Sequence, residues 1–297
     1  MALLAVSIFA ANAHAQDRHA RLVVAPAETL QVSMWGDGEP VVIVPGIWSS
    51  TYAFRKVVPR LRAEGVSVMV IEPLGVASSS RPRSANYSMT AQSRRIAAAL
   101  DSLGIRDAIF VGQALSASML LRLAIESPVR IRGMISLEGG ATDESATPGL
   151  RRGLAIAAFV FRIFPSQALM RQRVRSNLEN VSSDKSWINS ETVDGYMAPW
   201  RRSISETIQA YRAMASSREE IRLDTRLARV RMPISVLLGA APHYGGVQAV
   251  ELAPLQNLVP QVSITRVPGA GHLLHEERPD DVVRAILRMR ESTPRVN

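Results

Sequence analysis

Residues 109–118 read IFVGQALSAS, and this stretch decides the fold. Residues 108–111 form an apolar run that is too short for a helix, whereas residues 116–126 follow a helical pattern. Between the two, the chain turns through the small residues Gly112 and Ala114. A buried strand that passes abruptly into a helix is typical of proteins in which strands and helices alternate.

The same alternation extends outward in both directions. Short apolar runs predict further strands at 41–44, 66–71, 133–137, 234–238 and 262–267, and residues 31–35 predict an earlier antiparallel strand. Helical patterns lie between them at 52–63, 90–103, 246–258 and 280–291. The sequence therefore predicts an α/β fold, with a mostly parallel sheet of about eight strands and helices on both faces.

The alternation stops between residues 141 and 232. Helical patterns at 149–164, 166–179 and 203–217 predict an all-helical lid inserted into a core formed by residues 16–140 and 233–297. The segment 154–164, LAIAAFVFRIF, is its most apolar part. It either packs on the core and lines a pocket, or it contacts a membrane or lipid surface.

The composition excludes several kinds of protein. The 297 residues are 47% hydrophobic and include no Cys, which excludes a thiol nucleophile, a disulfide framework and a Cys-ligated metal. The net charge is +9, but all except Lys56 and Lys185 of the 35 basic residues are Arg, as coding bias would produce. Because no nucleic-acid-binding motif accompanies the charge, we expect no nucleic-acid partner.

Residues 1–15 read MALLAVSIFAANAHA and are uncharged. An apolar run that ends in Ala-His-Ala is typical of a secretory signal peptide, which predicts a periplasmic or secreted protein. The basic residue usual near the start is missing, so the alternative is an apolar N-terminus on a cytoplasmic protein. No other stretch is apolar enough to span a membrane.

Four segments, in this order, resemble the α/β-hydrolase fold family over about residues 30–290. They are GEPVV at 38–42 before the turn at Pro45 and Gly46, EPLGVASS at 72–79, the stretch 109–118, and GAGH at 269–272. The resemblance implies the α/β-hydrolase fold and hydrolysis of the esterase type, on a small or acylated apolar substrate. Since no metal-binding, P-loop or dinucleotide-binding motif is present, we expect neither a cofactor nor a metal.

The resemblance places the family's serine nucleophile at Ala114, whose side chain cannot attack a carbonyl. In this register the strand-to-helix turn is the nucleophile elbow and Ala114 is its apex. Alternatively the elbow is shifted by two residues and Ser116 is the nucleophile. The first alternative keeps the family's spacing, and it places Ser116 in the first helical turn with its hydroxyl away from the crevice.

The resemblance implies that His272, in a Gly-rich loop after the last strand, is the catalytic base. The loop after strand 234–238, where many members carry the acid, has no carboxylate. Members such as the haloalkane dehalogenases place the acid one strand earlier, which here is Glu138 in the segment ISLEGG at 135–140. Glu138 would fix the tautomer of His272, or it simply caps the start of the lid. Glu276 and Glu277 are expected on the surface.

The family's oxyanion-hole donors fall on the backbone N–H groups of Ile47 and Leu115. Trp48, His243 and Tyr244 are expected to line the pocket. Three functions remain open: a serine-type esterase, a ligand-binding protein that has lost its nucleophile, and a cofactor-free enzyme in which His272 and Glu138 act as a general base. All three predict a small-molecule substrate or ligand.

Overall fold

The computed structural model describes residues 17–164, 166–201 and 203–293, so the proposed signal peptide at 1–15 lies outside the described residues. The strands form one eight-stranded sheet in the order β1-β2-β4-β3-β5-β6-β7-β8. They are β1 (Arg18–Ala25), β2 (Glu28–Trp35), β3 (Pro40–Val44), β4 (Ser67–Glu72), β5 (Ala108–Gln113), β6 (Ile131–Leu137), β7 (Ile234–Gly239) and β8 (Val262–Val267). The pairs β1–β2 and β2–β4 are antiparallel, and the other five pairs are parallel. The α/β fold class and the mostly parallel sheet are thus confirmed.

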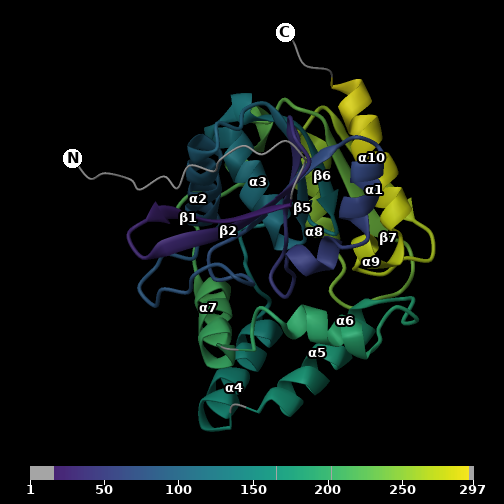
Figure 1. The fold of residues 1–297 in the computed structure, drawn as a ribbon. Coiled ribbons are helices and arrows are strands. Elements are labelled where there is room, and N and C mark those ends of the chain that lie inside the picture. The colour runs from purple at the N-terminus through teal and green to yellow at the C-terminus, as the bar shows by residue number, and fades with distance from the viewer. Residues whose placement is uncertain (1–16, 165, 202, 294–297) are drawn as a thin grey trace.

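Helices cover both faces of this sheet (Figure 1). The core helices are α1 (Val57–Ala63), α2 (Met89–Ser102), α3 (Leu115–Glu126), α8 (Ala249–Leu258), α9 (Leu274–Glu277) and α10 (Pro279–Ser292). Helix α1 contacts α10, and α2 contacts α3. Strand β3, inside the sheet, is apolar on both sides because both are buried: Val42 and Val44 pack in one cluster, and Val41 and Ile43 pack in the other.

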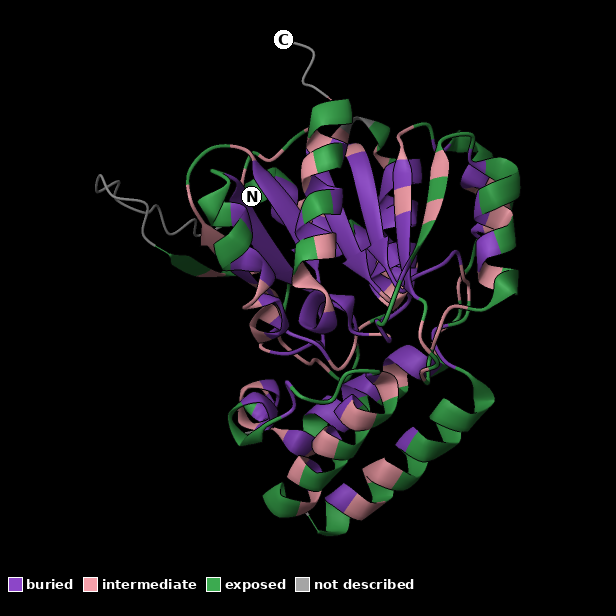
Figure 2. Cartoon of the chain, turned by 90° about the vertical axis from the view of Figure 1, so that its right-hand side faces the viewer, coloured by how far each residue is buried: buried purple, intermediate pink, exposed green. Residues whose placement is uncertain are grey.

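The chain between β6 and β7 is helical, as predicted. It contains α4 (Pro148–Ile163), α5 (Gln167–Val181), α6 (Ser190–Met197) and α7 (Ile204–Ser216), followed by a 3₁₀ helix at Asp224–Arg229. These four α-helices form a layer of their own beneath the sheet in Figure 1, and Figure 2 shows that this layer is far more exposed than the strands. The boundaries 141 and 232, and the role as a lid, stay predictions.

One side of α4 is apolar and exposed. Its outward residues include Ile156, Phe159 and Ile163, with Phe164 next in the chain, and each is at least half exposed. Contact of this side with a membrane surface stays a prediction. No helix among the described residues has the length and apolar character needed to cross a bilayer.

Local structure departs from the sequence patterns at four places. The predicted helix 52–63 is split into a 3₁₀ helix at Thr51–Phe54 and α1, and the predicted helix 246–258 begins only at Ala249. Strand β1 was missed because Arg18, His19 and Arg21 interrupt its apolar pattern. Helix α6 was missed as well, since it is only eight residues long.

Candidate active site

The turn from β5 into α3 has Ala114 at its apex. Ala114 is the N-cap of α3 and has φ 48° and ψ −122°, a backbone conformation that costs a residue with a Cβ about 1–3 kcal/mol. Its N–H donates to the Leu137 carbonyl at 2.8 Å. A Cβ on Gly139 would lie 2.4 Å from the Ala114 carbonyl oxygen, so only glycine fits beside the turn. Strand β5 ends at Gln113, which places the elbow in the unshifted register.

Ser116 does not fit the alternative of an elbow shifted by two residues. Its side chain is fully buried, and Oγ donates a hydrogen bond to the Pro45 carbonyl at 2.7 Å. The hydroxyl therefore joins the first turn of α3 to the turn after β3, and it is not presented to a substrate.

The two expected oxyanion-hole donors flank this contact. Ile47 follows Gly46, whose N–H donates to Gln113 Oε1 at 3.2 Å, and Leu115 is the first residue of α3. Both are partly exposed, and neither N–H donates a hydrogen bond to another described residue. The backbone geometry thus leaves two donors beside Ala114, and their role in catalysis stays a prediction.

Glu72, at the end of β4, is a positioning residue whose role the sequence did not reveal. Its Oε1 accepts hydrogen bonds from the N–H and the hydroxyl of Thr51, each at 2.8 Å, and its Oε2 accepts from Ser78 N–H at 2.7 Å. Burial raises the pKa of Glu72, while these hydrogen bonds oppose the rise. One carboxylate therefore ties the loop after β3 to the loop after β4.

Glu138 occupies a strained position at the end of β6, with φ 50°, and its side chain is almost completely buried. Oε1 accepts a hydrogen bond from Gly239 N–H, and Oε2 accepts one from Val247 N–H at 3.4 Å. His272 Nδ1 lies 3.7 Å from Oε2. The structure thus brings the predicted acid and base together, and the alternative of a simple cap at the start of the lid does not account for these contacts.

His272 is held from its backbone. Its N–H donates to the Val181 carbonyl at 2.9 Å, which connects the loop after β8 to the end of α5. A Cβ on the preceding Gly271 would come within 2.7 Å of the Ser183 nitrogen and the Val181 oxygen, so the close approach requires glycine. Since Nδ1 faces Glu138, Nε2 is the ring nitrogen left for other chemistry.

His243 and Tyr244 were both expected to line the pocket, and the structure separates them. The side chain of His243 is buried, and its Nε2 lies 3.5 Å from Glu138 Oε2, so two histidines approach one carboxylate oxygen. The ligand atoms of Glu138, His243 and His272 all lie within 4.8 Å of one another, and this group could hold a metal ion. Tyr244 is 76% exposed, so its expected place in the pocket is wrong.

The expectation that Glu276 and Glu277 lie on the surface is also wrong, because both are buried. Glu276 accepts a hydrogen bond from the Tyr196 hydroxyl at 2.9 Å and pairs with Arg55 and Lys56. Glu277 Oε2 accepts from the N–H groups of Gly271, Ser183 and Asp184. No sequence pattern indicated this burial, because α9 is only four residues long and the partners Tyr196 and Ser183 come from the distant insertion.

Trp48 lies in the turn after β3, where aromatic residues of the inserted helical segment meet the core, and its place in the pocket stays a prediction. Its ring contacts Tyr211 edge-on at 4.5 Å and Trp200 at 5.9 Å between centroids. The backbone N–H of Trp48 donates a hydrogen bond to the Tyr211 hydroxyl oxygen at 3.4 Å. Trp200 and Tyr211 are fully buried, so the insertion closes over the turn after β3 with apolar rings.

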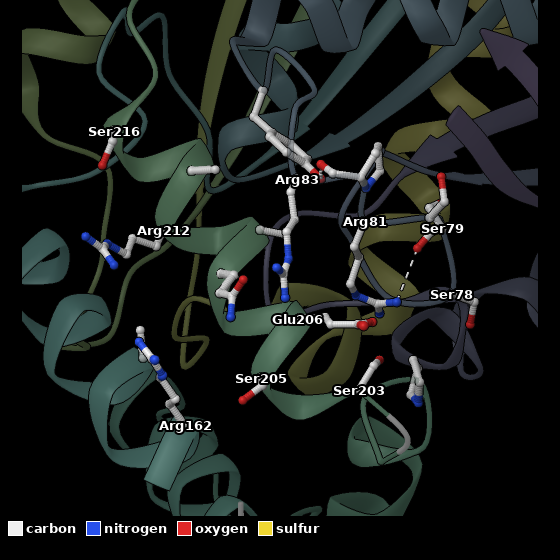
Figure 3. A pocket seen from close by; sticks show the side chains of 18 of the residues that line it. Ser78, Ser79, Arg81, Arg83, Arg162, Ser203, Ser205, Glu206, Arg212 and Ser216 are labelled. Atoms are coloured by element: carbon white, nitrogen blue, oxygen red, sulfur yellow. Dashed lines mark hydrogen bonds between the residues drawn. The ribbon is translucent and has the colours of Figure 1, made fainter. Parts of the chain in front are cut away.

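An arginine-rich crevice of about 1620 Å³ lies between the loop after β4 and helices α4 and α7. Arg21, Arg81, Arg83, Arg162 and Arg212 line it, and Glu206 is the one carboxylate among its lining residues. Figure 3 shows four of these arginines around the open space, with Arg81 donating to the Ser79 carbonyl at 3.3 Å. None of the predicted catalytic residues lines it. The excess of Arg, explained above by coding bias, concealed this cluster.

Comparison with known proteins agrees with the fold. The chain is 25% identical to "Uncharacterized hydrolase YugF" of Bacillus subtilis over 244 residues, which are 82% of this chain and 86% of that protein. It is 23% identical to "Haloalkane dehalogenase 2" of Mycobacterium tuberculosis over 265 residues, 85% of this chain and 88% of that one. A solved alpha/beta hydrolase fold protein from Burkholderia ambifaria superposes with a TM-score of 0.76 at 21% identity, over 93% of this chain and 99% of the other.

The chain also matches a whole family. Residues 41–285, from β3 to within α10, match the alpha/beta hydrolase family. The match contains the elbow, Glu138, the helical insertion and His272. The relatives named above are hydrolases, and the chain belongs to the alpha/beta hydrolase family.

Proposed function

We propose that this protein hydrolyses small or acylated apolar esters without a covalent intermediate, with His272 as a general base on water. The observation that carries the proposal is the apex of the elbow, where Ala114 keeps the strained backbone of a nucleophile but has no hydroxyl. The His272–Glu138 pair and the free N–H groups of Ile47 and Leu115 surround a turn that is intact apart from that one group.

The proposed reaction needs only these groups and water. His272 Nε2 accepts a proton as the water oxygen bonds to the carbonyl carbon, while Glu138 holds the proton on Nδ1. The N–H groups of Ile47 and Leu115 stabilise the oxyanion, and the imidazolium returns the proton to the leaving alkoxide as the ester bond breaks. General-base catalysis contributes about 10²–10⁴-fold and each oxyanion donor about 10²–10³-fold, so we expect slow turnover.

The aromatic residues at the site support an apolar substrate. Trp48 is partly exposed beside Ile47, and Trp200 closes the same region from the insertion. An acyl group bound against these rings would place its carbonyl next to the two backbone donors. The size of the acyl group depends on how far the insertion opens.

Restoring the missing hydroxyl tests the proposal. We expect the wild-type protein to hydrolyse p-nitrophenyl acetate slowly and to resist a fluorophosphonate probe. The variant Ala114→Ser should hydrolyse the ester at least about 100-fold faster, because nucleophile, base and oxyanion donors then act as a unit. Mass spectrometry should locate the probe at position 114 alone.

The controls separate the three functions left open by the sequence. Adding Glu138→Gln to Ala114→Ser should remove most of the gain, whereas adding Glu251→Gln, on α8, should not. No turnover by the wild type, together with a gain in Ala114→Ser, would support a ligand-binding protein that has lost its nucleophile. A folded Ala114→Ser variant with neither gain nor label would contradict the proposed geometry, and a wild-type adduct on Ser116 would restore the shifted elbow.

A further inference from the structure

We propose that Glu138, His243 and His272 form a binding site for a divalent transition-metal ion, and that Zn²⁺ fits it best. The three side chains come from the ends of β6, β7 and β8, which are neighbours in the sheet. Two imidazoles and one carboxylate are a ligand set that proteins use for zinc, with a fourth position left for water. Sequence motifs gave no sign of the site because the ligands lie on three separate loops.

The spacing of the ligand atoms fits such an ion. Glu138 Oε2 lies 3.5 Å from His243 Nε2 and 3.7 Å from His272 Nδ1. Ligands about 2.0–2.1 Å from a tetrahedral zinc are about 3.4 Å from one another. Two of the three separations therefore need to contract by only a few tenths of an ångström. The third is within 4.8 Å and closes by rotation of the partly exposed His272 ring.

The tautomer of His243 supplies an independent argument. Its Nδ1 lies 2.8 Å from the Ala241 carbonyl, which can only accept, so Nδ1 carries the proton. In the neutral ring Nε2 then bears a lone pair, and this nitrogen lies 3.5 Å from a carboxylate oxygen. Two such atoms repel one another unless a proton or a cation lies between them.

Burial makes this conflict expensive. His243 Nε2 and His272 Nδ1 are both buried and have no hydrogen-bond partner among the described residues. Unpaired buried nitrogens destabilise the folded protein, and a metal ion would satisfy both at once. The Ala241 carbonyl contacts His243 Nδ1, and the Gly239 N–H donates to Glu138 Oε1. Hydrogen bonds of this kind orient the side chains that bind a metal.

This inference does not rest on the proposed ester hydrolysis, because metal binding is measured directly. It has one consequence for that function: an ion on Glu138 and on His272 Nδ1 displaces the proton through which Glu138 orients the base. Zn²⁺ should therefore inhibit the esterase activity of Ala114→Ser.

The test is a titration of the chelator-treated protein with Co²⁺, followed by its visible absorption, and with Zn²⁺, followed by calorimetry. We expect one ion per chain. His243→Ala and Glu138→Gln should each weaken binding by more than about 100-fold. The matched control His19→Ala, on β1, should bind as the wild type does.

Three results would overturn the proposal: no Co²⁺ absorption, equal binding by wild type and His243→Ala, or loss of binding in His19→Ala. Circular dichroism identifies a variant that fails to fold, and His243→Gln then takes the place of His243→Ala. NMR titration of the histidines is a second test of the metal site. If His243 is an imidazolium at neutral pH in metal-free protein and stays so when Zn²⁺ is added, a proton fills the gap and the metal site is wrong.

Discussion

Glu277 is the residue whose replacement most sharply tests how the insertion is attached to the His272 loop. Its Oε2 accepts three backbone N–H groups: Ser183 and Asp184 at 2.9 Å each, and Gly271 at 3.0 Å. The first two belong to the segment between α5 and α6, and the third precedes His272. Glu277→Ala therefore cuts a connection between the insertion and the His272 loop.

Removing the Glu277 carboxylate does not cost the same free energy at each of the three N–H donors. Ser183 and Asp184 are exposed, so water can replace the carboxylate there at a cost of about 0.5–1 kcal/mol each. Gly271 is buried, and leaving its N–H unpaired costs about 1–3 kcal/mol. We expect Glu277→Ala to lower the free energy of unfolding by about 2–5 kcal/mol, and Glu277→Gln, which keeps an acceptor but loses the charge, by about half as much.

Urea denaturation followed by circular dichroism measures this free energy, and calorimetry should show a fall in Tm of about 4–8 °C for Glu277→Ala. Glu291→Ala, at the exposed end of α10, is the matched control and should change the free energy by less than about 0.5 kcal/mol. Equal stability of Glu277→Ala and Glu291→Ala would refute the assignment of Glu277 as a buried anchor. So would a Glu277→Gln variant that is less stable than Glu277→Ala.

Two further predictions concern other buried polar groups. Ser116→Ala should lower the free energy of unfolding, measured by urea denaturation, by about 1–3 kcal/mol, because the Pro45 carbonyl loses its buried donor. When Ser116→Ala is added to Ala114→Ser, the probe should still label position 114. Loss of that label would mean that Ser116 takes part in the chemistry. Burial lowers the pKa of His275 from 6.5 to about 3, so the unfolded chain binds a proton between these pH values and the native chain does not. Stability should therefore fall as the pH drops from about 6.5 toward 3, by about 2 kcal/mol at pH 5 from this residue. The variant His275→Phe can keep the stacking on Phe54. Between pH 7 and pH 5 its free energy of unfolding should fall by about 2 kcal/mol less than that of the wild type. An identical pH dependence would contradict the assignment of this effect to His275.

Much of the fold was readable from the sequence because inner strands such as β3 and β5 are buried on both faces. Such strands appear as unbroken apolar runs, and residues 41–44 and 108–111 lie inside β3 and β5. Strand β1 could not be found in this way, since none of its residues is fully buried and its register comes from pairing with β2. Strand β8 was predicted although most of its residues are exposed or only partly buried, so burial alone did not decide which strands were visible.

The elbow and Glu138 were predictable for a similar reason: each follows a recognisable strand. The convergence of His243 on Glu138 was not, because it depends on which strands are neighbours and on how the loop after β7 folds back. The burial of Glu276 was hidden too. Its partners Arg55, Lys56 and Tyr196 lie far away in the chain, and only the docking of the insertion brings Tyr196 to it.

The strained backbone of Ala114 explains why a missing hydroxyl does not imply a ruined site. A φ of 48° costs free energy at any residue with a Cβ, yet here no exposed nucleophile compensates for it. The conformation persists because three hydrogen bonds around it impose it. The Ala114 N–H donates to the Leu137 carbonyl, the Ser116 hydroxyl donates to the Pro45 carbonyl, and the Gly46 N–H donates to the Gln113 side chain. None of these contacts involves the side chain at position 114. The turn, the two free N–H groups and the His272–Glu138 pair are therefore set independently of the nucleophile, and for that reason one added oxygen atom should suffice to test the whole arrangement.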